Sequence, residues 1–414
     1  IGGSGISAVA RIAQAQDFQV SGCDLEESRI TRQLVKDGIK VDIGHHQSHL
    51  KNSDLLVHTP AIFYQSVAHP EYTRAVKRKI AVTWEQFMAK YLHKKKCVVA
   101  VVGMHGKWTT TGMLSWILEQ ANFDPTCEIG AGLLAWDHNN YRVGKSKYFI
   151  CEADEFQEKF LLYKPDMAII TSMEMDHPEC FQNFDQVLAA FRKFAAKAKI
   201  LIVNEELKKF KLSPKAIYYK PVKLKLLLPG SHIKSDAGAA GAAAKALGVK
   251  DNVIKKALLT FTGLERRFEY RGETDGVKLY DDYAHHPTAV TANIKATREL
   301  YPKKKIWVVF QPHMYNRLEK LFDDFAKSLK LADRVVVADV YTRRERGVNK
   351  PSGKDLALVI GGPKATYVGG DLTNVANFIA RNTKKTDVVL VMGAGDIYKV
   401  SDQLINAQTH SIDN

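Results

Sequence analysis

The chain has 414 residues, too many for one hydrophobic core, so we expect two or three domains. Its residues are 45% hydrophobic and 25% charged, a globular balance that excludes a disordered or fibrous protein. The longest apolar run, CVVAVV at 97–102, is far shorter than the roughly 20 residues of a membrane helix, so we expect no membrane insertion.

Five cysteines are far apart, odd in number and without a C-x-x-C pair. This pattern predicts a reducing, cytoplasmic location and argues against a disulfide scaffold or a zinc finger. The chain begins at Ile1 without an initiator Met or a signal peptide, so we expect further N-terminal residues to precede it.

The net charge is +15, from 60 Lys plus Arg against 45 Asp plus Glu. The basic residues form short runs, at 90–96, 211–225 and 301–305, which are typical of solvated turns and linkers. None alternates with aromatic residues as single-strand binding surfaces do, so we expect no nucleic-acid partner. A positive field would also attract a phosphorylated small-molecule substrate.

Apolar strands alternate with helical patterns throughout, which predicts an α/β fold with parallel sheets. We expect three domains, at 1–90, 97–264 and 267–414, with a Lys-rich linker after the first.

The first segment opens with the turn GGSG and a helical pattern. Glycines let the backbone approach a phosphate, and the helix N-terminus supplies amide donors. Asp24 ends the next strand, near the position of a ribose-binding acid. The alternative is a tight β–α turn that needs small residues; the strand that should precede the turn is absent from the chain.

The second segment opens with the strand 97–102, the loop Gly103 to Lys107 and the helical pattern TTTGMLSWILEQ. This is a short G-x-x-G-K phosphate loop, in which Lys107 would reach the terminal phosphate of ATP. A Ser or Thr normally follows the lysine to bind magnesium, and Trp108 stands there instead.

Two further groups follow strands of this segment: Glu152 after KYFI and His177 after MAIITS. At the ends of neighbouring strands they would converge beside the phosphate loop as ligands of a hard cation. The alternatives are a surface-turn histidine and a neighbour of a helix N-cap.

In the third segment, DDYAHHPT follows the strand VKLY and FQPHMYNR follows KIWVV. Open α/β sheets bind ligands at the carboxyl ends of their strands, so a ligand-contacting role is favoured. The paired histidines lack a second ligand cluster with zinc spacing.

In order, the chain carries GGSG, GMHGK-TTT, EADE, MDH, PGSH, GLERRF, DDYAHHPT, FQPH, YTRRE and MGAGDI. Over essentially its whole length it resembles the Mur ligases of peptidoglycan synthesis. DDYAHHPT with FQPH resembles the muramate-recognising branch, whereas the phosphate loop belongs to a wider superfamily that includes folylpolyglutamate synthase.

The resemblance implies three domains: a Rossmann-like N-terminal domain for the UDP substrate, a central P-loop domain for ATP, and a Rossmann-like C-terminal domain that brings in the amino acid. It implies an ADP-forming ligase that uses ATP and Mg²⁺. The lactyl carboxylate of UDP-N-acetylmuramate would become an acyl phosphate, which the amine of L-alanine would attack.

The resemblance also implies the site residues. ATP would contact Gly103, Met104, His105, Gly106, Lys107, Trp108, Thr109, His232, Arg267 and Asp282. The metal would lie on Glu152 and His177, which with Lys107 form the catalytic group. The UDP-sugar and amino acid would contact Gly3, Ser4, Asp24, His45, His286, His313 and Arg317.

Three other functions remain open from the sequence. One is a recycling ligase that attaches a preformed peptide to UDP-N-acetylmuramate. Another is a nicotinamide-dependent oxidoreductase, which GGSG and Asp24 suggest but which leaves Lys107, Glu152 and His177 unexplained. The third is a weakly active or non-catalytic relative that binds UDP-N-acetylmuramate. The oligomeric state is not predicted.

Overall fold

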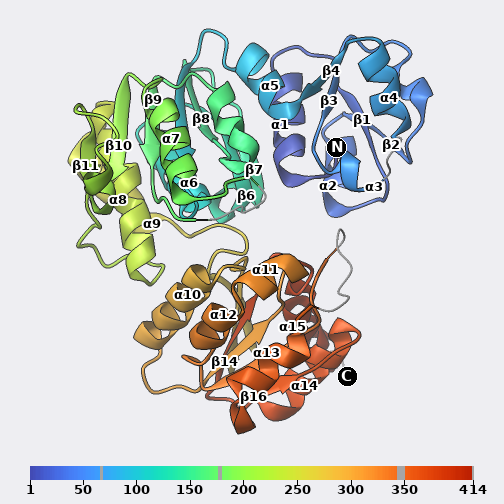
Figure 1. Ribbon diagram of the computed structural model, residues 1–414, viewed down its shortest axis with the longest axis vertical. Coiled ribbons are helices and arrows are strands. Elements are labelled where there is room, and N and C mark those ends of the chain that lie inside the picture. Colours follow the sequence, from blue (N-terminus) through green and yellow to red (C-terminus); the bar gives the residue numbers. More distant parts are fainter. Residues whose placement is uncertain (66–68, 176–179, 343–349, 413–414) are drawn as a thin grey trace. The chain divides into compact units, whose positions relative to one another are not determined.

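The computed structural model of the chain describes residues 1–65, 69–175, 180–342 and 350–412. These residues form two compact units, one of residues 1–227 and 234–262 and one of residues 228–233 and 263–414 (Figure 1). The expected division of the first unit into a UDP-binding and an ATP-binding domain is finer and remains a prediction.

The N-terminal part of the first unit alternates short strands with helices, as a Rossmann-like fold does. Two parallel strand pairs are formed, β1 (Ser21–Asp24) with β2 (Lys40–Ile43) and β3 (Leu56–His58) with β4 (Ala81–Thr83). The helices are α1 (Ser4–Gln14), α2 (Arg29–Lys36), α3 (Ile62–Gln65), α4 (Pro70–Lys77) and α5 (Trp84–Phe87). Ala10 of α1, Leu34 of α2 and the following Ile39 form a small buried core.

The predicted Lys-rich linker at 90–96 is only partly a linker. A π-helical turn covers Met88–Leu92, and the side chains of Met88, Leu92 and His93 are buried. The prediction is wrong for this half of the segment, because apolar residues between the lysines anchor it in the core of the first unit. An exposed turn is left around Lys94 and Lys95.

The larger sheet of the first unit has the strand order β11-β10-β9-β5-β8-β6-β7. Its strands are β5 (Cys97–Val102), β6 (Thr126–Leu133), β7 (Asn139–Arg142), β8 (Tyr148–Glu152), β9 (Met167–Ile170), β10 (Ile200–Asn204) and β11 (Ile217–Tyr219). Only β7 pairs antiparallel among these described strands. The helices that follow them are α6 (Lys107–Gln120), α7 (Phe184–Ala195), α8 (Ser231–Ala246) and α9 (Asp251–Thr260).

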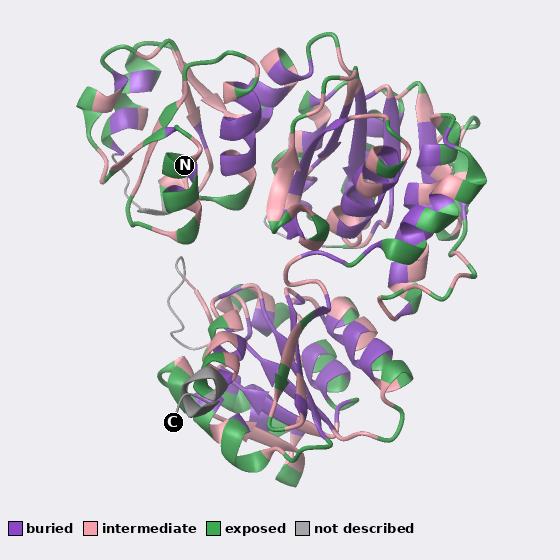
Figure 2. Cartoon of the chain, turned by 180° about the vertical axis from the view of Figure 1, so that it is seen from behind, coloured by how far each residue is buried: buried purple, intermediate pink, exposed green. Residues whose placement is uncertain are grey.

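Central strand β5 is apolar along its whole length because both of its faces are covered. Val98, Ala100 and Val102 belong to the core that includes α7, while α6 packs against β5, β6 and β8. Figure 2 shows these strands as a continuous buried layer. Because the strands are parallel, their carboxyl ends lie on the same side of the sheet. The loop between β5 and α6 begins at this side.

The second unit contains a six-stranded sheet of order β12-β13-β17-β14-β15-β16, in which only β12 pairs antiparallel among the described strands. The strands are β12 (Glu269–Thr274), β13 (Val277–Asp282), β14 (Ile306–Phe310), β15 (Arg334–Val337), β16 (Ala365–Tyr367) and β17 (Val388–Met392). The helices are α10 (Pro287–Leu300), α11 (Tyr315–Lys320), α12 (Phe322–Leu329), α13 (Gly353–Ile360), α14 (Leu372–Asn382) and α15 (Tyr398–Ile412).

Successive residues of β14 face opposite sides of this sheet. Val308 belongs to the core with α10, α12 and α13, whereas Val309 belongs to the core with α14 and α15. The predicted α/β fold with parallel strands is thus confirmed, and each of the two large sheets also has one antiparallel strand at its edge. None of the helices that the structure describes is long and apolar enough to cross a membrane.

Candidate active site

The loop between β5 and α6 has the geometry of a phosphate cradle. Gly103 has a φ of +144°, and a Cβ there would lie 2.2 Å from Thr171 Oγ1, so only glycine fits. The His105 amide donates to Ser172 Oγ at 2.8 Å, and Thr171 Oγ1 donates to the His105 carbonyl at 2.5 Å. Residues just after β9 therefore fix the loop from the side.

Helix α6 begins directly after this loop, so the amide groups of its first turn point back toward the loop. The N-cap is Gly106, in the left-handed region at φ +81°, and glycine has no side chain of its own to cap the first amides. Amides of Lys107, Trp108 and Thr109 therefore meet the requirements of an ATP phosphate site. Met104 differs, because its buried side chain packs in the core, so only its backbone can shape the cradle.

The Lys107 ammonium group lies inside the loop and forms a buried ion pair. Its Nζ donates to the Gly103 carbonyl at 2.8 Å and to both Glu155 carboxylate oxygens at 2.7 Å. Burial lowers the pKa of Lys107, but the carboxylates of Glu155 and Asp154 outweigh it and raise that pKa above its usual value. The sequence motif EADE contained Glu155, yet we expected only Glu152 to act.

Glu152 ends β8 beside the first turn of α6, as expected. Its Oε1 accepts from the Gly130 amide at 2.7 Å. A Cβ on Gly130 would lie 2.9 Å from Glu152 Oε2 and 2.5 Å from Trp108 Nε1, so the indole lies beside this carboxylate. Nearby, burial and the charge of Glu152 raise the pKa of Glu128 well above its usual range. Trp108 thus stands next to the expected metal ligand.

These oxygen donors fit a hard cation, since Mg²⁺ is bound by one or two carboxylates and several waters. Glu152 is the described residue that would hold it. His177, the second expected ligand, lies outside the described residues.

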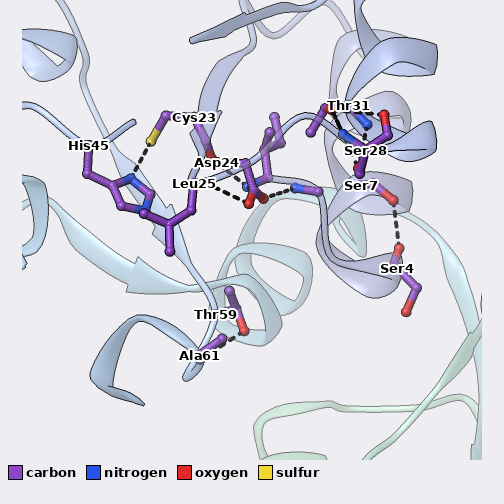
Figure 3. A network of polar contacts seen from close by, with 12 residues as sticks. Ser4, Ser7, Cys23, Asp24, Leu25, Ser28, Thr31, His45, Thr59 and Ala61 are labelled. Atoms are coloured by element: carbon purple, nitrogen blue, oxygen red, sulfur yellow. Dashed lines mark hydrogen bonds and ion pairs between the residues drawn. The ribbon is translucent and has the colours of Figure 1, made fainter. Parts of the chain in front are cut away.

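Three of the four expected UDP-binding residues, Gly3, Ser4 and Asp24, lie at the N-terminal glycine turn, where Figure 3 labels Ser4 and Asp24. The Gly2 amide donates to Asp24 Oδ2 at 2.7 Å, and Gly3 is the N-cap of α1 without a side-chain cap. Burial raises the pKa of Asp24, whereas the hydrogen bonds that the Gly2 and Leu25 amides donate to its carboxylate lower that pKa. Ser4 is exposed, and its carbonyl accepts from Ser7 Oγ at 2.8 Å.

His45, the fourth expected UDP-site residue, contacts protein groups. Its Nδ1 lies 3.2 Å from Cys23 Sγ and 3.3 Å from Glu71 Oε2. No motif or spacing in the sequence connects these three residues.

In the second unit, Asp282 holds the chain around it. Its Oδ2 accepts from the Phe268 amide and its Oδ1 from the Ala284 amide, both at 2.7 Å. His286 is the N-cap of α10 and accepts from the Thr288 amide through Nδ1 at 3.4 Å. Neither arrangement tests the expected ligand contacts of Asp282 and His286.

The expected amino-acid residues lie together after β14. Arg317 Nη1 lies 3.3 Å from His313 Nδ1, and the His313 ring stacks on Tyr341 with centroids 5.8 Å apart. His285 also reaches this cluster, 5.8 Å from His313 between ring centroids. Burial and the Arg317 charge lower the pKa of His285 well below its usual value, so its imidazole is neutral at pH 7.

His232 lies in the 228–233 segment of the second unit, and the Arg267 guanidinium group lies over the Tyr283 ring at 5.6 Å. Their expected contacts with ATP remain predictions. The preceding residue, Arg266, was missed: it pairs with buried Asp281 at 3.1 Å and donates to the carbonyls of Gly393 and Gly395.

Three family models match the chain in order: the Mur ligase family catalytic domain over residues 1–96, the Mur ligase middle domain over 101–227, and the Mur ligase glutamate ligase domain over 266–395. A UDP-N-acetylmuramate–L-alanine ligase of Alkaliphilus metalliredigens is 33% identical over 445 aligned positions, which cover 98% of this chain and 95% of the relative.

Comparison with solved structures also places the chain among the Mur ligases. The crystal structure of a UDP-N-acetylmuramate-alanine ligase from Thermotoga maritima is 28% identical and matches with a TM-score of 0.85 over 99% of this chain and 98% of that one. A folylpolyglutamate synthase/dihydrofolate synthase from Yersinia pestis, complexed with AMPPNP and a manganese ion, shares the fold at 16% identity, with a TM-score of 0.56 over 78% of this chain and 92% of that one. The resemblance seen in the motifs is confirmed, and the chain belongs to the Mur ligase family.

Proposed function

We propose that this protein is an ATP-dependent amide ligase that joins L-alanine to the lactyl carboxylate of UDP-N-acetylmuramate and forms ADP and phosphate. The observation that carries the proposal is the phosphate loop, in which the Lys107 ammonium group and the glycine-capped N-terminus of α6 lie beside Glu152. Full-length similarity to the ligases of Alkaliphilus and Thermotoga supports the choice of substrates.

A carboxylate is a poor electrophile, so the reaction needs two steps. The carboxylate oxygen first attacks the γ-phosphorus of ATP, ADP leaves, and an acyl phosphate forms. The amine of L-alanine then attacks the acyl carbon, loses a proton, and displaces phosphate. Since all the partners of the first step are anionic, catalysis rests mainly on positioning and neutralisation of charge.

The residues of the loop would divide this work. Lys107 would move from Glu155 to the β- and γ-phosphates, while the backbone from Gly103 to Thr109 cradles them. Glu152 would bind Mg²⁺, and the charge of this ion would neutralise that of the phosphates. A protein of the same fold complexed with AMPPNP and a manganese ion supports a divalent metal beside ATP. Arg317 would pair the alanine carboxylate by two hydrogen bonds.

The N-terminal part would bind the UDP group. Asp24 holds the glycine turn through the Gly2 amide, which leaves the N-terminus of α1 open to a diphosphate. We expect this chemistry in the cytoplasm, where ATP and UDP-linked precursors are supplied.

The test is phosphate release with ATP, Mg²⁺ and UDP-N-acetylmuramate, with L-alanine, glycine or a tripeptide as the amine. We expect turnover to be fastest with L-alanine and absent when the UDP-sugar is omitted. Faster turnover with the tripeptide would assign the recycling reaction instead. Binding of UDP-N-acetylmuramate without turnover of any amine would assign a non-catalytic role.

A further inference from the structure

A thiol, an imidazole and a carboxylate meet in the N-terminal part of the first unit. Cys23 Sγ lies 3.2 Å from His45 Nδ1 and 3.1 and 3.3 Å from the two carboxylate oxygens of Glu71. His45 Nδ1 lies 3.3 Å from Glu71 Oε2. Figure 3 shows the Cys23 sulfur and the His45 ring turned toward each other. One donor atom from each of the three residues therefore points into one small space.

The three residues come from separate segments of the chain. Cys23 lies in β1, His45 follows β2, and Glu71 lies in the first turn of α4. Because β1 and β2 are parallel, their carboxyl ends deliver Cys23 and His45 to the same edge. A group that bound all three would tie this edge to α4.

The charge of Glu71 needs a partner that the described residues do not supply as a permanent cation. The residue is only 2% exposed, and its ion-pair partners in the described part of the chain are histidines. No Lys or Arg pairs with it there. Buried carboxylates are normally paired with a cation or bound to a metal, because an isolated buried charge is costly. A divalent cation would provide the missing charge.

The spacing of the donor atoms fits a tetrahedral zinc ion. Bond lengths of about 2.3 Å to sulfur and about 2.0–2.1 Å to nitrogen or oxygen place neighbouring ligand atoms about 3.3–3.6 Å apart. The observed separations of 3.1–3.3 Å need only a few tenths of an ångström of expansion. Thiolate and imidazole ligands select zinc and similar ions over Mg²⁺ or Ca²⁺, which require oxygen.

The surroundings include the hydrogen bonds that orient a metal ligand. His49 Nδ1 lies 2.6 Å from Glu71 Oε1, so its ring can hold the carboxylate while the other oxygen binds the ion. The His69 ring packs against His45 with centroids 4.3 Å apart. Without a metal, burial and Glu71 raise the pKa of the Cys23 thiol to about 12; a bound cation would displace its proton into solvent.

We propose that Cys23, His45 and Glu71 bind one Zn²⁺ ion, with a water in the fourth position and His49 as the hydrogen-bonding partner of Glu71. The ion stabilises the N-terminal part, which has two separate strand pairs and a small local core. Coordination through Nδ1 leaves Nε2 of His45 available for the expected contact with the UDP-sugar. This proposal does not depend on the ligase activity.

The test uses the full chain, loaded with Zn²⁺ or Co²⁺ with Mg²⁺ in large excess to occupy the ATP site. After dialysis we expect about one equivalent of zinc per chain, and for Co²⁺ an intense near-ultraviolet band from thiolate-to-metal charge transfer. The band reports sulfur coordination in the unmodified protein and needs no variant. Wild-type protein that retains no zinc and shows no such band would overturn the proposal.

Variants then locate the site. Cys23→Ser should lose the cobalt band, and Cys23→Ser and Glu71→Gln should each retain less than about a tenth of the zinc. The matched control is Cys97→Ser, another half-buried cysteine of the same unit, which should keep both the zinc and the band. A band that persists in Cys23→Ser but disappears in Cys97→Ser would refute the assignment.

Discussion

Lys107 donates from Nζ to both carboxylate oxygens of Glu155 at 2.7 Å, and the Glu155 side chain is only 1% exposed. The sequence suggests a lysine on an exposed glycine turn, whose loss would affect chemistry and little else. The structure instead makes it half of a buried ion pair. An ATP phosphate that enters the loop would compete with Glu155 for the same ammonium group.

Lys107→Ala should therefore affect both activity and stability. We expect ligation to be abolished, because no cation would then bind the β- and γ-phosphates. The free energy of unfolding should also fall by about 3–5 kcal/mol, since the buried Glu155 carboxylate would lose its lysine partner. Phosphate release and urea denaturation measure the two effects separately.

The double variant Lys107→Ala/Glu155→Gln is the control for that prediction. Replacing the buried Glu155 carboxylate with a neutral amide should restore much of the stability while ligation stays absent. Recovery of activity in the double variant would contradict the role given to Lys107, and a fully stable single variant would contradict the importance of the pair.

Arg317 should act on the amino acid and not on ATP. Arg317→Ala is expected to raise the KM for L-alanine about 10- to 100-fold, the loss expected for hydrogen bonds to a charged group, and to leave the KM for ATP nearly unchanged. Lys320→Ala is the matched control, because Lys320 is an exposed cation on the same helix α11. A change confined to the KM for ATP would show that the assignment is wrong.

The strand–loop–helix unit around Lys107 could be predicted because its signals are local. The sequence shows a buried strand, then a glycine loop, then a helical pattern. The structure confirms them in that order as β5, the loop from Gly103 to Gly106, and α6. The same locality explains what was missed at Glu155. EADE offers three acidic residues, and only the path of the chain after β8 decides which one reaches Lys107.

Contacts between residues far apart in the chain could not be predicted, because sequence patterns report only local structure. Arg266 binds the carbonyls of Gly393 and Gly395, and Cys23 meets Glu71, through pairings that no spacing rule encodes. The burial of Leu92 and His93 also escaped prediction, because the neighbouring lysines dominate the local pattern.

His93 should make the first unit sensitive to acid. Its ring is enclosed by Phe149 and Tyr163, with centroids 4.8 Å away in each case, and burial lowers its pKa from 6.5 to about 4. Between these values the unfolded chain binds a proton that the folded chain does not, so stability falls as the pH drops from 6.5 toward 4. The loss between pH 7 and pH 5 is about 2 kcal/mol.

His93→Phe keeps an aromatic ring and removes the titrating group, so most of this pH dependence should disappear. Denaturant unfolding of both proteins at pH 7 and pH 5 measures it. Asp281 acts in the opposite sense, because burial raises its pKa to about 6, but it is present in both proteins and cancels in the comparison. Equal losses in the two proteins would contradict the buried neutral state of His93.

Trp108→Thr addresses the residue that departs most from a phosphate loop. The hydroxyl that normally follows the lysine binds magnesium, and an indole has no oxygen to offer. Thr109 cannot replace it directly, because one residue along a helix turns the side chain by about 100°. The structure places the Trp108 indole beside Glu152, the expected metal ligand. We therefore expect a water to fill the missing ligand position in the native protein.

On this basis, Trp108→Thr should lower the magnesium concentration for half-maximal activity, on the order of 10-fold, and raise kcat. Titrating magnesium against phosphate release for both proteins measures the change. The matched control is Trp116→Phe on the same helix, because the Trp116 indole donates to the Ala257 carbonyl at 3.1 Å and not to a carboxylate. Magnesium curves that superimpose for wild type and Trp108→Thr would show that residue 108 does not influence the metal. The indole would then pack against Gly130 without affecting the cation, and the carboxylate of Glu152 would bind the cation unaided by its neighbour on α6.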